Sequence, residues 1–109
     1  MHTLDTWAGR SSFSYTGSVR TGTKLTYGAG WTTNVTADQY AALLTYFRGR
    51  TVNIGTSRTD PPKDSVGEWL IENVTKTGIA SYIGPILIAE GYAAKGERAE
   101  IRFNNAYPS

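Results

Sequence analysis

Residues 64–103, DSVGEWLIENVTKTGIASYIGPILIAEGYAAKGERAEIRF, decide the fold expected of this chain. A helix is predicted from Ser65, because Ser65-Val66-Gly67-Glu68 has the pattern of a capping box. A turn at 75–77 leads into a second helix, and residues 93–103 then fold back around a glycine as a β-ribbon. Helix, turn, helix and ribbon is the element order of a winged helix-turn-helix, a module that most often docks a helix against nucleic acid.

The second of these helices is expected to begin at Thr77 as its N-cap and to end at Gly91. Pro85 lies inside it and lacks the backbone N–H that the helix needs, so either a kink or a break into two short helices is expected. Its buried stripe is predicted from the apolar residues Ile79, Ile83, Ile86 and Leu87.

The first part of the chain predicts a different structure. Residues 1–35 alternate small polar with apolar or aromatic residues around glycines, which indicates an antiparallel β-unit. Thr36-Ala37-Asp38-Gln39 is a capping box that opens a helix, and Thr51–Ile54 reads as a short strand. The expected fold is therefore one α+β domain over residues 1–109, with a β-unit (1–35) and a part (36–109) of three helices and a C-terminal ribbon.

Composition excludes several classes of protein. The chain has 109 residues, no cysteine and one histidine, so disulfides and thiolate chemistry are absent. No apolar run approaches the roughly 20 residues that a bilayer requires, and no signal peptide is recognisable at the start. A cytoplasmic protein that does not enter the membrane is expected, and the tail 104–109 is expected to fray.

Charge is distributed unevenly along the chain. Residues 1–63 carry seven basic and three acidic residues, a net +4, whereas residues 64–109 carry four basic and six acidic ones, a net −2. Attraction to phosphate would therefore come from the first half, although an ordinary solvated surface explains the same numbers.

No catalytic or metal-binding pattern is present. His2 lies in a terminus that is expected to be mobile, and no cluster of His, Cys, Asp or Glu has the spacing of metal ligands. A non-enzymatic binding protein without a cofactor is expected.

Nucleic acid is the first partner to consider. The basic segment 48–63 would supply phosphate contacts, and the second helix of the winged-helix part would supply base contacts. The ordinary interpretations are a proline-stiffened connector for the loop 55–63 and a core position for the tyrosine of that helix. The candidate residues are Arg48, Arg50, Arg58 and Lys63 in the segment, and Lys76, Thr77, Ser81 and Tyr82 in the helix-turn-helix.

The alternative is an oligomeric protein that binds a small ligand or another protein. Aromatic residues of the β-unit beside Arg10, Arg20 and Lys24 could form a flat platform or a homo-oligomer interface. These aromatic residues are Trp7, Tyr15, Tyr27 and Trp31.

The segments TVNIGTSRTDPPKDSVGEWL and VTKTGIASYIGPILIAEGYA resemble small uncharacterised proteins encoded by bacterial integron gene cassettes and other mobile elements. The resemblance covers about residues 36–103. It implies a short, cysteine-poor cytosolic accessory protein, often oligomeric, and it implies no site residues.

Overall fold

The computed structural model describes residues 1–108 and shows, over those residues, seven strands and three helices. The strands form two antiparallel sheets, with strand orders β1-β2-β3-β4 and β5-β7-β6. The predicted α+β class and the N-terminal antiparallel unit are confirmed. In chain order the elements are β1 (His2–Asp5), β2 (Ser12–Ser18), β3 (Gly22–Tyr27), β4 (Trp31–Val35), α1 (Ala37–Phe47), β5 (Thr51–Asn53), α2 (Val66–Asn73), α3 (Ala80–Ala89), β6 (Ala93–Lys95) and β7 (Glu100–Phe103).

The winged-helix order of residues 64–103 is present as predicted. Helices α2 and α3 follow one another across a turn, and β6 and β7 form the ribbon behind them. The short strand β5 joins the ribbon on its β7 side, with Val52 opposite Ile101. Within residues 1–108 no helix is both long and apolar enough to traverse a bilayer.

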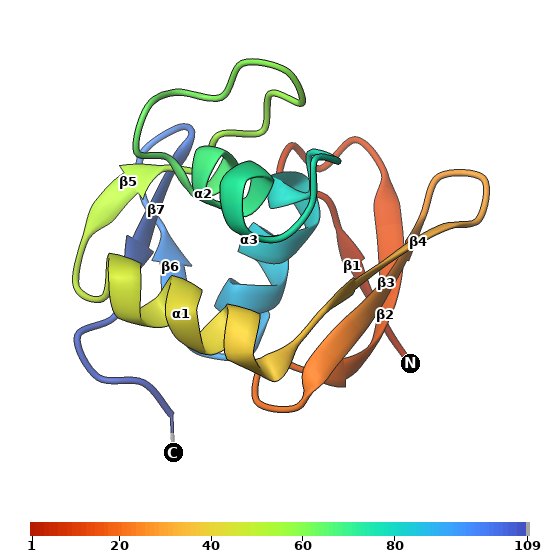
Figure 1. Ribbon diagram of the computed structural model, residues 1–109, viewed down its shortest axis with the longest axis horizontal. Helices are drawn as coiled ribbons and strands as arrows, with labels where there is room; N and C mark the ends of the chain where they lie inside the picture. Colours follow the sequence, from red (N-terminus) through yellow and green to blue (C-terminus); the bar gives the residue numbers. More distant parts are fainter. Residues whose placement is uncertain (109) are drawn as a thin grey trace.

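The four-stranded sheet turns one face towards the helices. Along β2 and β3 the inward residues alternate with exposed polar ones, as a half-buried sheet requires. Figure 1 shows α3 between this sheet and the three-stranded sheet, and α1 passing beneath it. One hydrophobic cluster joins the layers, and it includes Phe13, Tyr15, Leu25, Tyr40, Phe47, Ile83, Leu87, Ile101 and Phe103.

Both segments predicted as capping boxes open a helix, and the first forms a complete box. The Gln39 backbone N–H donates to the Thr36 hydroxyl at 3.1 Å, and the Thr36 N–H donates to the Gln39 side chain at 2.9 Å. At α2 the Ser65 hydroxyl accepts from the Glu68 N–H at 3.1 Å. The Glu68 carboxylate, however, accepts from the Asp64 N–H at 2.7 Å, one residue earlier than in a standard box.

The prediction that Thr77 caps α3 is wrong. The helix begins at Ala80, its N-cap is Ile79, and no side chain caps it. The Thr77 N–H donates instead to the Thr75 hydroxyl at 3.3 Å, which holds the turn outside the helix. Ile79 and Ala80 are both buried, so packing sets the start of α3 in place of a polar cap.

Pro85 does not divide α3, which is one helix from Ala80 to Ala89. A proline leaves the carbonyl four residues earlier without its helical partner. That carbonyl belongs to Ser81, and it accepts a hydrogen bond from the Trp7 backbone N–H at 2.9 Å. The segment after β1 therefore satisfies the carbonyl that Pro85 leaves free.

The tail from Asn104 to Pro108 does not fray as expected. The Tyr107 hydroxyl donates to the Leu44 carbonyl at 2.7 Å. The Arg48 guanidinium lies 4.6 Å from the centre of the Tyr107 ring.

Candidate functional site

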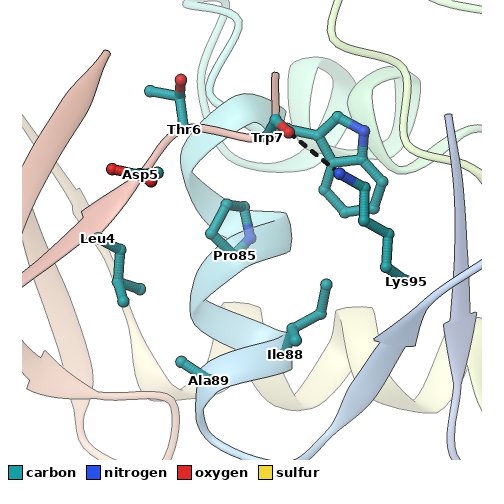
Figure 2. A pocket seen from close by; sticks show the side chains of 8 residues that line it. All are labelled: Leu4, Asp5, Thr6, Trp7, Pro85, Ile88, Ala89 and Lys95. Atoms are coloured by element: carbon teal, nitrogen blue, oxygen red, sulfur yellow. Dashed lines mark hydrogen bonds between the residues drawn. The ribbon is translucent and has the colours of Figure 1, made fainter. Parts of the chain in front are cut away.

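A cavity of about 280 Å³ lies between β1, α3 and β6. Figure 2 shows α3 at its floor, the residues of β1 on one side and Lys95 on the other. We call it the apolar cavity, because aliphatic, proline and indole groups form most of its lining. Its residues are Leu4, Asp5, Thr6, Trp7, Pro85, Ile88, Ala89 and Lys95.

Trp7 forms one end of the apolar cavity and is held there by four contacts. Its N–H donates to the Ser81 carbonyl, and its ring packs so closely on α3 that a Cβ at Gly84 would lie 2.8 Å from it. Its carbonyl accepts from the Lys95 ammonium at 3.4 Å, and this ammonium lies 4.8 Å from the indole centre. The Lys95 cation is thus drawn over the indole face, where cations are stabilised.

A second cavity, of about 500 Å³, lies towards the start of β1. We call it the polar cavity, because a carboxylate, a phenol and an imidazole are among its lining groups. Its residues are Met1, His2, Thr3, Leu4, Tyr15, Gly17, Ser18, Ala89 and Glu90.

Glu90 connects the end of α3 to the sheet. One of its carboxylate oxygens accepts from the Tyr15 hydroxyl at 2.9 Å, and the other accepts from the Val19 backbone N–H at 2.9 Å. Burial of the phenol, together with this hydrogen bond and the nearby negative charge, raises the pKa of Tyr15 to about 12. Tyr15 is therefore a neutral hydrogen-bond donor at physiological pH.

The two cavities adjoin, because Leu4 and Ala89 line both of them. Together they form what we call the β1–α3 groove, apolar at the Trp7 end and polar at the Glu90 end. Such a surface can hold a small molecule with an apolar body and a polar head.

Sequence reasoning missed this groove. His2 was expected in a mobile terminus, yet it is the first residue of β1, pairs with Tyr15 and has its ring centroid 4.8 Å from that of Tyr15. The sequence signal that could have indicated the groove is Gly84-Pro85 within an apolar helix. Glycine leaves space on the helix surface, and proline leaves a helix carbonyl without its usual partner, so another segment can pack and hydrogen-bond there.

The helix expected to contact bases is covered. Tyr82 is only 7% exposed, and its ring stacks on Tyr27 at 4.5 Å and lies 5.1 Å from that of Phe13. Ser81 is half-buried, and its carbonyl is occupied by Trp7. Tyr82 is therefore not available to a nucleic-acid groove, and the core position considered for it is the one observed. A base contact by the Ser81 side chain stays a prediction.

Arg48 and Arg50 have separate neighbours within the molecule. Arg48 donates to the Asn105 carbonyl at 3.0 Å. Arg50 pairs with Asp64, which also accepts from the Tyr46 hydroxyl at 2.7 Å. Hydrogen bonds from Tyr46 and Arg50 lower the pKa of Asp64.

Arg58 and Lys63 are exposed in the loop between β5 and α2. Arg58 lies beside the α2–α3 turn, since a Cβ at Gly78 would lie 2.9 Å from its Cα. The exposed residues Lys76 and Thr77 belong to that turn. Lys63 is next to Asp64 and helps to lower its pKa. Arg48, Arg50, Arg58 and Lys63 therefore have three different sets of neighbours.

The aromatic platform expected on the β-unit is not present as a set. Of its four members only Trp31, at 70%, is an exposed large side chain. Tyr15 is 3% exposed, and Trp7 and Tyr27 pack against the core cluster. Alternation along β2 and β3 turns Tyr15 and Tyr27 towards the helices.

Among residues 1–108 no three His, Asp or Glu side chains are grouped so that they could hold a metal ion. Comparison with protein families, with curated proteins and with solved structures finds no match to this chain. The resemblance to integron cassette proteins stays a prediction.

Proposed function

We propose that this protein is a non-enzymatic binding protein that holds a small amphipathic molecule in the β1–α3 groove. The observation that carries the proposal is the joining of an apolar cavity of about 280 Å³ to a polar cavity of about 500 Å³ at Leu4 and Ala89. A ligand with both an apolar and a polar part would use both sections at once.

The construction of the groove supports this proposal. Trp7 is fixed by its hydrogen bond to Ser81 and by its contact with Gly84, so the wall does not need to form on binding. A preformed wall spares the ligand the cost of ordering it. Pro85 and Ile88 are only half-buried and leave apolar surface for the ligand to cover.

Blocking the groove should weaken the binding of an apolar dye. We expect N-phenyl-1-naphthylamine, an uncharged dye, to bind the native protein saturably, with enhanced fluorescence. Ala89→Phe should weaken this binding by about tenfold or more, roughly 1.4 kcal/mol, because Ala89 lines both cavities. Fluorescence titration measures the effect, with near-UV circular dichroism to verify native packing.

Ala41→Phe is the matched control for this substitution. Ala41 is an exposed alanine of α1 and lines neither cavity, so the dye should bind this variant as it binds the parent. Equal binding to all three proteins would contradict a site in the groove.

Nucleic acid remains the second candidate, supported by one feature. Arg58 lies beside the turn that carries Lys76, and Lys63 is exposed in the same loop as Arg58. Arg58, Lys63 and Lys76 could contact phosphates even though α3 itself does not contact the nucleic acid. Such binding would not distinguish sequences, because phosphate contacts carry no base information.

We expect any binding of duplex DNA to be weak and without sequence preference. With about three phosphates contacted, the slope of log K against log salt should be no steeper than about −3. Arg58→Gln with Lys63→Gln should reduce that slope by about two, as measured by fluorescence anisotropy of a labelled duplex. Preference for one sequence over a scrambled duplex would instead indicate that α3 becomes uncovered.

Self-association is part of the same proposal. Trp31, 70% exposed, begins β4, which is an edge strand of the four-stranded sheet. A second copy of the chain would bury this side chain, as interfaces commonly bury tryptophan.

A further inference from the structure

Glu90 occupies an unusual place for a carboxylate. It is the C-cap residue of α3, where the partial charge of the helix end is itself negative. It is half-buried and lines the polar cavity. It accepts hydrogen bonds from two neutral groups, the Tyr15 hydroxyl and the Val19 N–H.

Neither of these two donors brings a positive charge to Glu90. An ionised carboxylate can accept about four hydrogen bonds, and Glu90 accepts one on each oxygen. A cation entering the cavity would therefore find free acceptor positions and the negative end of α3 together. Hydrogen bonds between a cation and a carboxylate are roughly twice as strong as those between neutral groups.

The lining of the polar cavity suits a cationic head group in one further respect. The Tyr15 ring is 3% exposed and packs with its centroid 4.8 Å from that of His2, and its hydroxyl is the group that meets Glu90. The raised pKa of Tyr15 keeps its proton on the hydroxyl, so this group does not compete as a second anion.

We propose that the polar cavity selects the protonated amine of a ligand whose apolar chain lies in the adjoining apolar cavity. The ligand class is a primary alkylammonium, with its head at Glu90 and its chain passing Leu4 and Ala89. This inference rests on the proposed function, because the apolar cavity must hold the chain.

Three six-carbon probes that differ only in the head group test this selection. They are n-hexylammonium chloride, n-hexanol and sodium hexanoate, titrated into the full chain by calorimetry at neutral pH. We expect hexylammonium to bind at least about tenfold more tightly than hexanol, and hexanoate to bind most weakly. Ammonium chloride alone should not bind, since it lacks the chain.

Substitutions at two carboxylates locate the selection. Glu90→Gln keeps the size of the side chain and removes its charge, so the preference for hexylammonium over hexanol should fall by about tenfold. Glu97→Gln changes an exposed carboxylate that lines neither cavity, and it should leave the preference unchanged. Amide chemical shifts of Val19 and Ala89 should move with hexylammonium in the parent protein.

The outcomes separate this inference from the function on which it rests. Dye binding in the groove with no preference among the three probes would overturn the ammonium site alone. An unchanged preference in Glu90→Gln would do the same. If Glu90→Gln does not fold, the relative affinities of the three probes for the parent protein still test the ammonium site. If neither the dye nor any probe binds the parent protein, the groove is not a ligand site.

Discussion

Gly67→Ala is expected to destabilise the protein strongly, although alanine normally stabilises a helix by about 1 kcal/mol relative to glycine. Gly67 lies in the first turn of α2, and its N–H donates to the Ile54 carbonyl at 2.9 Å. A Cβ at this position would overlap the carbonyl oxygen of Gly55 and would lie 2.8 Å from its carbonyl carbon. The atoms in the way belong to the backbone of Gly55, which cannot rotate away as the end of a flexible side chain can.

Relief would require the segment at Gly55 to shift away from α2. Gly55 has a φ of +68°, a conformation that favours glycine, and Ile54 before it is fully buried. Shifting this segment would therefore disturb the core as well as the hydrogen bond. We expect a loss of about 3 kcal/mol in the free energy of unfolding, and a fall in Tm of roughly 15 °C.

Thermal and urea unfolding followed by circular dichroism would measure this effect. Glu72→Ala is the matched control, because Glu72 is exposed on the same helix and its replacement should change stability by less than about 0.5 kcal/mol. A rise in the Tm of Gly67→Ala would show that α2 and Gly55 are not in contact.

The second large effect concerns alkaline pH. Burial is the main cause that raises the pKa values of both Tyr15 and Tyr40. The Tyr40 hydroxyl lies in the core, 2.7 Å from the Thr23 hydroxyl to which it is hydrogen-bonded, and Tyr40 is fully buried. Ionising either phenol in the folded protein would place a negative charge in an apolar interior, next to Glu90 in the case of Tyr15.

The sign of the pH dependence follows from these two pKa values. Unfolded tyrosines lose their protons near pH 10, whereas folded Tyr15 keeps its proton until about pH 12. Between these values the folded chain binds more protons than the unfolded chain, so stability falls as pH rises. The stability is fully present below pH 10, and Tyr15 alone accounts for a loss of about 2 kcal/mol by pH 12.

Urea unfolding at a series of pH values, with tyrosine ionisation followed by ultraviolet absorbance, would measure the decline. The double variant Tyr15→Phe/Tyr40→Phe should lose much less stability over the same interval, because neither phenol remains to be ionised. Between pH 6 and 9 these two groups should contribute no slope in either protein. An identical alkaline decline in the parent and the double variant would contradict this assignment.

Local patterns predicted the elements well. Thr36-Ala37-Asp38-Gln39 has the capping box that the sequence indicates, with both of its hydrogen bonds formed. Helix, turn, helix and ribbon follow in the expected order over residues 64–103. Such signals depend on hydrogen bonds and side-chain spacing within a few residues, so they can be read from the chain itself.

Contacts between distant segments could not be read in the same way. Thr77 offered a suitable cap, but burial of Ile79 set the beginning of α3 instead. Arg50 offered a free cation, but it pairs with Asp64. The start of α3 and the pairing of Arg50 are each set by a contact in the folded protein, and that contact outweighs the local sequence preference.

By itself the sequence determined the α+β class, the capping box of α1, the serine cap of α2 and the winged-helix order, because these depend on local periodicity and capping. Only the tertiary structure decided that the N-terminal sheet covers α3, and that Trp7 docks on the helix where Gly84 has no side chain and Pro85 frees the Ser81 carbonyl. The same docking brings His2, Tyr15 and Glu90 to one cavity. The physical reason is that apolar surface is buried by whichever segment can reach it, and neighbours in the sequence do not specify which segment that is.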